Sequence, residues 1–116
     1  MSIMAFMSQW YFNSPITVWP FLGEAQWGGG ETYGEGYLII GEREGKTFQS
    51  RDESGAEFTV KDVYYTGDPR PKYKDRIAYG DKTSMTWDEA EAEQIKRKNT
   101  HAMIAFGYED EFDYET

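Results

Sequence analysis

The sequence of 116 residues has the length of one domain, with twenty-one acids against twelve Lys and Arg, one His and no Cys. The missing Cys excludes disulfides, thiolate metal sites and a thiol nucleophile, and no apolar run approaches the ~20 residues of a membrane span. Only two residues are Leu, but twenty are Phe, Tyr or Trp, and each of these rings can bury about 150–250 Å². The first residues lack the basic start of a secretory signal. We therefore expect a folded cytoplasmic domain with an aromatic core.

The charges divide the chain into three parts. Residues 1–42 contain four acids and no Lys or Arg, residues 43–107 contain twelve acids and all twelve bases, and residues 108–116 contain five acids. A run of like charges repels itself and is typically solvated. The sequence therefore predicts a single β-rich domain over residues 1–107 and a separable acidic tail over residues 108–116.

The N-terminal third predicts two extended segments and a glycine-rich loop. Aromatic residues 6–12 lead to a turn, and a second segment over 16–22 is interrupted by Pro20, because proline cannot donate to a strand ladder. The six glycines of residues 23–36 predict a mobile loop. This loop carries acids and no Lys or Arg, so its charge would repel a phosphate ligand. We expect it to be a bending or gating loop.

The middle of the chain predicts an antiparallel meander. Extended segments over 37–43, 46–50, 56–63 and 70–79 are separated by turn signals roughly 8–12 residues apart, at 44–45 and 52–55 among others. In the third of these segments, Phe58 and Val60 alternate with polar residues. The hairpin around residues 51–55 resembles that of small SH3-like barrels. This resemblance implies an SH3-like or OB-like, partly open barrel as one form of the meander.

One helix is expected near residues 87–98. Thr86 followed by Glu89 is the capping-box pattern, and acids at the start with bases at 96–98 complement the helix dipole. A buried strand over 102–106 follows. The predicted fold class is α+β: a small β-rich domain with one helix late in the chain.

No motif for catalysis or for metal binding is present in the sequence. His101 opens an apolar segment without an accompanying Ser or Cys motif, so a structural role is favoured for it. One His without Cys cannot build a zinc site, and the acids lack the spacing of a calcium-binding loop. We expect no enzymatic activity, no cofactor and no metal.

A first candidate site is a row of four alternating cations. In an extended strand Arg70, Lys72, Lys74 and Arg76 would point to one side at intervals of ~6.6 Å, where they could contact phosphates or an acidic protein. Tyr64 and Tyr65 could stack on unpaired bases. The competing interpretation is an edge strand whose charges prevent aggregation.

A second candidate site is the C-terminal segment, in which acids alternate with aromatic residues. Its candidate partner-binding residues are Tyr108, Glu109, Asp110, Glu111, Phe112, Asp113, Tyr114 and Glu115. Charge can steer an encounter with a basic surface, and the rings can bury on contact. The composition is similar to the acidic aromatic tails of bacterial and phage single-strand-binding proteins, which compete for the protein's own basic groove and recruit partners. The terminal aromatic residue of those tails is replaced here by Glu115 and Thr116.

These features predict a non-enzymatic acidic interaction protein that binds and inhibits a basic, nucleic-acid-handling protein. In its sharpest form it mimics nucleic acid, as phage and plasmid inhibitors of host enzymes do. The first alternative is a single-stranded nucleic-acid-binding protein regulated by its acidic tail. The second alternative is a structural component of a virion or another assembly.

Overall fold

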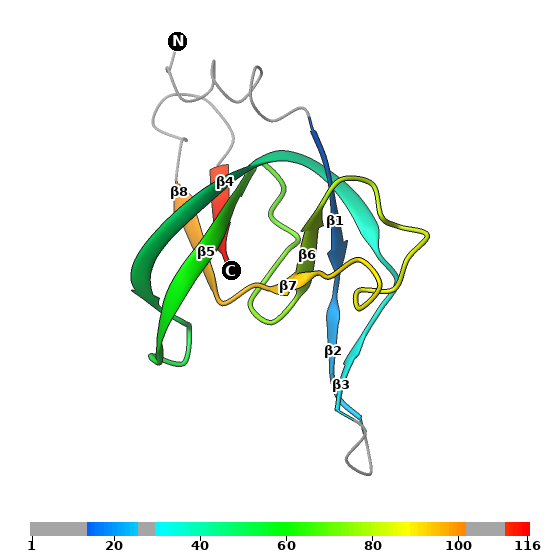
Figure 1. The fold of residues 1–116 in the computed structure, drawn as a ribbon, viewed down its shortest axis with the longest axis horizontal. Coiled ribbons are helices and arrows are strands. Elements are labelled where there is room, and N and C mark those ends of the chain that lie inside the picture. Colours follow the sequence, from blue (N-terminus) through cyan, green and yellow to red (C-terminus); the bar gives the residue numbers. More distant parts are fainter. Residues whose placement is uncertain (1–13, 26–29, 102–110) are drawn as a thin grey trace.

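The computed structural model describes residues 14–25, 30–101 and 111–116, which form nine strands in two antiparallel sheets. The strands are β1 (Ser14–Trp19), β2 (Phe21–Glu24), β3 (Glu31–Tyr33), β4 (Tyr37–Arg51), β5 (Glu57–Thr66), β6 (Arg76–Tyr79), β7 (Glu93–Gln94), β8 (Arg97–His101) and β9 (Glu111–Glu115). Seven of them form one open sheet in the order β7-β6-β1-β4-β5-β9-β8. Strands β2 and β3 form a separate ribbon that projects from this sheet (Figure 1). The prediction of a small β-rich domain is therefore confirmed.

The hydrophobic core lies against one face of the seven-stranded sheet. Residues two apart on a strand share a face, and the register sets Ile16 of β1 between Ile39 of β4 and Tyr79 of β6. The side chains buried together on this face are Ile16, Val18, Ile39, Tyr64, Ile77, Ile95, Phe112 and Tyr114. On the opposite face, Trp19 packs with three buried alanines, and Tyr33 and Trp87 cover them. Aromatic rings thus take the place of leucine in both clusters.

The long hairpin of β4 and β5 contains the turn predicted at residues 52–55. The Asp52 carboxylate accepts hydrogen bonds from the backbone N–H of Ser54 and of Ala56, each at 2.9 Å, which closes the turn through a side chain. The turn predicted at 44–45 is not formed. Strand β4 instead continues through it, and a one-residue shift in register between Gly45 and Phe48 marks a bulge.

The helix predicted near residues 87–98 is wrong, because the described residues contain no helix. The capping box does form, since Thr86 N–H donates to the Glu89 carboxylate and Glu89 N–H donates to the Thr86 hydroxyl, both at 3.2 Å. However, Glu91 adopts a left-handed backbone with φ of 54°, which ends the first turn. Ile95, fully buried in the main core, then fixes the following residues as extended chain. Tertiary burial outweighs local helix propensity here.

Part of the glycine-rich stretch is strand rather than loop. Phe21 of β2 pairs with Tyr33 of β3, and their rings meet edge to face with centroids 5.6 Å apart. The Thr32 hydroxyl donates to the Gly23 carbonyl at 2.9 Å, which adds a side-chain bond to the ladder. These contacts order the described part of residues 23–36 as a ribbon next to β1.

The C-terminal residues 111–116 are a buried strand rather than a solvated tail. Strand β9 lies between β5 and β8, and each of its residues is at most 9 % exposed. Phe112 and Tyr114 enter the main core, while the acids that alternate with them along β9 face the opposite side of the sheet. There the Asn99 amide donates to both Asp113 and Glu115 at 2.6 Å, so backbone pairing and amide donors offset the desolvation of these carboxylates.

Several predicted elements lie outside the described residues. These are the aromatic segment 6–12, the strand 102–106 and the first three residues of the predicted tail, 108–110. Across the residues that the structure describes, no helix is long and apolar enough to cross a membrane.

The half-buried carboxyl of Glu93 on β7 provides a pH-dependent contribution to stability. Burial, and the neighbouring carboxylate of Asp62, raise the pKa of Glu93, although the Thr116 hydroxyl donates to it at 2.5 Å. The unfolded chain therefore releases this proton at a lower pH than the folded one, and stability falls as pH rises from the unfolded pKa through the folded pKa.

Replacing Glu93 with Gln is expected to reduce the loss of stability as pH rises, because a neutral amide can donate to Asp62 and still accept from Thr116. The measurement is the free energy of unfolding in urea at pH 4 and at pH 7 for both proteins. The exposed acid Glu53 supplies the control, since Glu53→Gln should leave the difference between the two pH values unchanged. An equal loss of stability between pH 4 and pH 7 in Glu93→Gln and the parent would contradict the assignment.

Candidate binding pocket

A pocket of about 540 Å³ opens between the segment that links β3 to β4 and the turns that follow β6. Its lining residues are Trp19, Tyr33, Gly34, Glu35, Gly36, Thr83, Met85, Thr86 and Trp87. Pockets of about 300–1,000 Å³ lined by aromatic side chains and a few polar groups are typical ligand sites. This pocket is therefore the candidate functional site.

Trp19 and two glycines determine the shape of the pocket. Trp19 ends β1, is 2 % exposed, and donates its indole N–H to the Met85 carbonyl at 3.3 Å. A Cβ at Gly36 would lie 2.9 Å from the Trp19 Nε1, and one at Gly34 would lie 3.0 Å from the Pro20 Cγ. Only glycine lets the linking segment pass this close to β1. The glycine-rich sequence thus has a structural purpose at these two positions.

Arg76 holds two of the aromatic side chains from outside the pocket. Its guanidinium carbon lies 4.6 Å from the centre of the Trp87 ring and 5.5 Å from that of the Tyr33 ring. Its N–H groups donate to the Tyr33 hydroxyl at 3.1 Å and to the Ala92 carbonyl at 3.2 Å, and Glu31 lies 3.9 Å away. The two rings, tilted by 54° with centroids 5.0 Å apart, are therefore fixed before any ligand arrives.

A buried carboxylate ties the ribbon to the main sheet beside the pocket. Asp75 is 1 % exposed and accepts from the backbone N–H of Phe21 at 2.8 Å and of Lys72 at 3.1 Å. Burial raises the pKa of Asp75, while the two backbone donors favour its charged form. Through this bridge the start of β2 is positioned relative to β6, so the wall that contains Tyr33 has a fixed location.

Acidic side chains lie at the pocket and next to its lining segments. Glu35 is the one charged residue of its lining, is exposed, and has neither a hydrogen bond nor an ion pair with the residues that the structure describes. Burial, followed by the hydrogen bond to Glu31, raises the pKa of Tyr33, so the phenol remains neutral at neutral pH. Further exposed acids flank the lining segment 83–87, at Asp81, Asp88 and Glu89. A cationic group complements this combination of rings and carboxylates.

The row of four cations does not lie on one side of a strand. The chain between Arg70 and Asp75 turns, with Lys74 in a left-handed backbone (φ 76°), and the strand begins only at Arg76. Lys74 lies over the Phe21 ring at 5.3 Å, while Lys72 is exposed. The alternation on which this candidate site depended is therefore absent, because a turn interrupts the period of two.

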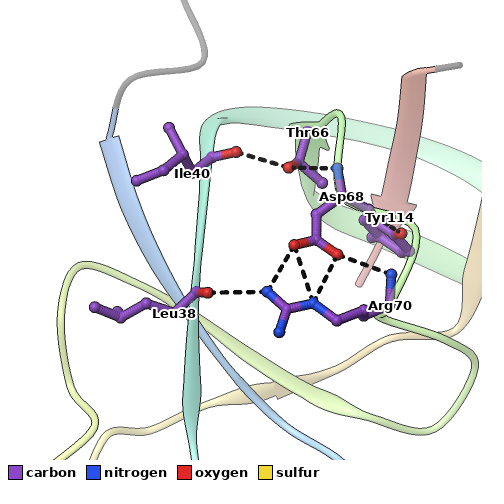
Figure 2. A network of polar contacts seen from close by, with 6 residues as sticks. All are labelled: Leu38, Ile40, Thr66, Asp68, Arg70 and Tyr114. Carbon is purple, nitrogen blue, oxygen red and sulfur yellow. Dashed lines mark hydrogen bonds and ion pairs between the residues drawn. The ribbon is translucent and has the colours of Figure 1, made fainter. Parts of the chain in front are cut away.

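Arg70 is exposed, but its guanidinium is paired with groups of the protein itself. Figure 2 shows its guanidinium against the Asp68 carboxylate, with contacts of 2.7–3.1 Å and a further bond to the Leu38 carbonyl at 3.3 Å. Its guanidinium also lies over the Tyr37 ring at 4.5 Å. Burial opposes the charge on Asp68, yet the bonds from Arg70 lower the pKa of this carboxyl below its usual value. This arrangement connects the β5–β6 segment to β4.

The two tyrosines predicted to stack on bases differ in exposure. Tyr64 is 1 % exposed in the main core, where burial raises its pKa, so its ring is not available to a ligand. Tyr65 is half-buried on the opposite face of β5, and its hydroxyl accepts from the Lys46 ammonium at 3.0 Å. The structure thus does not bring these rings together with the four cations.

The acids and rings of β9 also lie apart from the pocket. Glu111, Asp113 and Glu115 face the side of the sheet away from the main core, next to β8. The exposed His101 of β8 contacts the Asp113 carboxylate of β9 at 2.7 Å. Among the residues described, no group of three or more His, Cys, Asp or Glu side chains is placed to hold a metal ion.

Sequence reasoning did not find the pocket, because its three rings lie far apart in the chain. Trp19, Tyr33 and Trp87 belong to three separate segments, and only the folded sheet brings them together. The local signal was Gly34-Glu35-Gly36, in which small residues flank a lone acid. In comparisons with known proteins, no family model, curated protein sequence or solved structure matches this chain.

Proposed function

We propose that this protein is a non-enzymatic interaction protein that binds a basic protein partner through the acidic surface around the aromatic pocket. The observation that carries the proposal is the carboxylate of Glu35, which has no partner among the described residues and lines the same pocket as the rings of Trp19, Tyr33 and Trp87. Aromatic side chains in a preformed pocket provide much of the energy at protein interfaces, and surrounding charges direct the approach of the partner.

The partner class follows from the charge of this surface. Glu31 and Glu35 lie on one side of the pocket, and Asp81, Asp88 and Glu89 lie on or next to the other lining segment. Proteins that handle nucleic acids present Lys and Arg to the phosphate backbone and so offer a complementary surface. An acidic protein bound there would exclude nucleic acid, which is why we propose inhibition. The β9 carboxylates play no part in this proposal because they are buried.

Charge reversal at the pocket tests this function. Immobilised protein is exposed to a lysate of the organism that encodes it, and retained proteins are identified by mass spectrometry. Glu35→Lys should weaken binding of the basic partner at least about tenfold, because it places a like charge in the contact. Binding to the parent protein should also weaken with added salt.

The matched control is Glu53→Lys, which makes the same change at an exposed position in the β4–β5 turn. This variant should retain the partner as the parent does. Equal retention by the Glu35 and Glu53 variants, or a retained set without basic proteins, would refute the proposed function. Gel-shift assays with single-stranded DNA, run in parallel, measure direct nucleic-acid binding.

A further inference from the structure

We propose that the pocket recognises the guanidinium of an arginine side chain on the partner. This inference rests on the proposed function and names the group that enters the pocket. Three observations point to it. The ring pair already accommodates the guanidinium of Arg76, and, among the residues that the structure describes, the lining contains one carboxylate without a partner and no basic side chain.

Arg76 already makes a guanidinium contact with two rings of the pocket. Its guanidinium lies over both the Trp87 and Tyr33 rings without lining the pocket, so these rings already stack with a planar cation from outside. The charge of Arg76 is offset by Glu31 at 3.9 Å, which limits repulsion of a second cation. Tyr33 and Trp87 also line the pocket, where their ring quadrupoles favour the same kind of group.

The acceptors of the pocket also favour a ligand with N–H donors. The pocket offers the Glu35 carboxylate as an acceptor, whereas the Thr86 hydroxyl is engaged with Glu89 and the Met85 carbonyl with Trp19. A guanidinium presents parallel N–H donors to a carboxylate while its flat faces stack on rings. A lysine ammonium is more strongly hydrated and loses more on entering an aromatic site. A quaternary ammonium has no N–H to donate.

The size of the pocket fits an arginine side chain. A volume of about 540 Å³ has room for a whole side chain together with flanking backbone. The walls are set beforehand by the Trp19 bond to Met85 and by the close approach of Gly36. Little ordering cost then falls on the protein when an arginine enters, which favours binding of a short basic segment.

The experiment is an NMR titration with three peptides that differ at one central residue: arginine, lysine or citrulline. Citrulline keeps the shape of arginine but is neutral, so it isolates the charge. We expect the arginine peptide to shift the indole N–H signals of Trp19 and Trp87 and to bind about tenfold more tightly than the other two. Glu35→Gln should weaken the arginine peptide about tenfold and change citrulline binding little, while Glu53→Gln should change neither.

The outcomes separate this inference from the proposed function. Equal binding of arginine and lysine peptides at the pocket would overturn the arginine assignment and leave the basic partner in place. Peptide shifts outside the pocket, or none at all, would also overturn it, even if Glu35→Lys still loses the partner from lysate. If the lysate partner is insensitive to Glu35→Lys as well, both proposals fail. Since Glu35 is exposed, its variants are expected to fold.

Discussion

Replacing Tyr114 with Ala is expected to lower the free energy of unfolding by about 3–5 kcal/mol, a large part of the roughly 5–15 kcal/mol that domains commonly have. The Tyr114 ring is fully buried in the main core, and its hydroxyl donates to the Asp68 carbonyl at 2.8 Å. The alanine variant leaves a cavity and an unpaired acceptor. Urea unfolding followed by circular dichroism measures the loss.

Tyr114→Phe is the matched control, because it removes the hydroxyl and keeps the ring. It should cost about 1 kcal/mol, the typical contribution of one hydrogen bond. If β9 were a solvated tail, neither substitution would alter the unfolding midpoint, and that result would refute the buried strand. Deleting residues 111–116 should unfold the domain, since β8 would lose its partner strand. Truncation therefore cannot test partner binding, and point substitutions are needed.

Gly41→Ala is expected to destabilise the protein by about 3 kcal/mol. A Cβ at this position in β4 would lie 2.3 Å from the backbone carbonyl oxygen of Tyr65 and 2.9 Å from the Ile16 side chain. The carbonyl belongs to the neighbouring strand of the same sheet, so relief of the clash requires β4 and β5 to separate. Thermal or urea unfolding with the folded sheet signal as readout measures the effect.

Gly45→Ala, four residues further along β4, is the control. A Cβ there meets only the Asp62 carboxylate oxygen at 3.7 Å, an ordinary contact. Alanine should be neutral or stabilising by about 0.5–1 kcal/mol, because it restricts the unfolded chain. Similar effects of the two substitutions would contradict the packing described for Gly41.

The strands that the sequence predicted well carry local signals. The hairpin turn after Arg51 depends on the Asp52 side chain and on Gly55, both within the turn itself. The break at Pro20 also follows from one residue, since proline has no N–H to donate, and β1 and β2 lie on either side of it. Such features can be derived without knowing what packs on them.

The helix and the tail were mispredicted because local signals competed with burial. The Thr86 capping box forms as expected, but the partner of Ile95 is a core built from distant strands. In the C-terminal segment, acids alternate with Phe112 and Tyr114, which is also the period of a strand with one apolar face. High charge favoured the tail interpretation, whereas the sheet pairs the backbone on both sides of this segment.

The pocket could not be predicted from a single sequence. The sequence showed an acidic, glycine-rich stretch at residues 23–36 without phosphate-binding features, and Glu35 of this stretch lines the pocket. The rings of Trp19 and Trp87 could not be assigned to it, because they come together only through β1 and the turns after β6. Of the four predicted cations, only Arg76 lies near this pocket, where it stacks on the back of Trp87.

The position of β9 between β5 and β8 has a consequence for aggregation during folding. Among the described strands, β8 pairs only with β9, which follows it in the chain. A folding chain in which β9 has not yet docked therefore has unpaired edges on both β5 and β8. Exposed edges can pair with other chains and aggregate. Refolding in which β9 docks late should therefore favour aggregation.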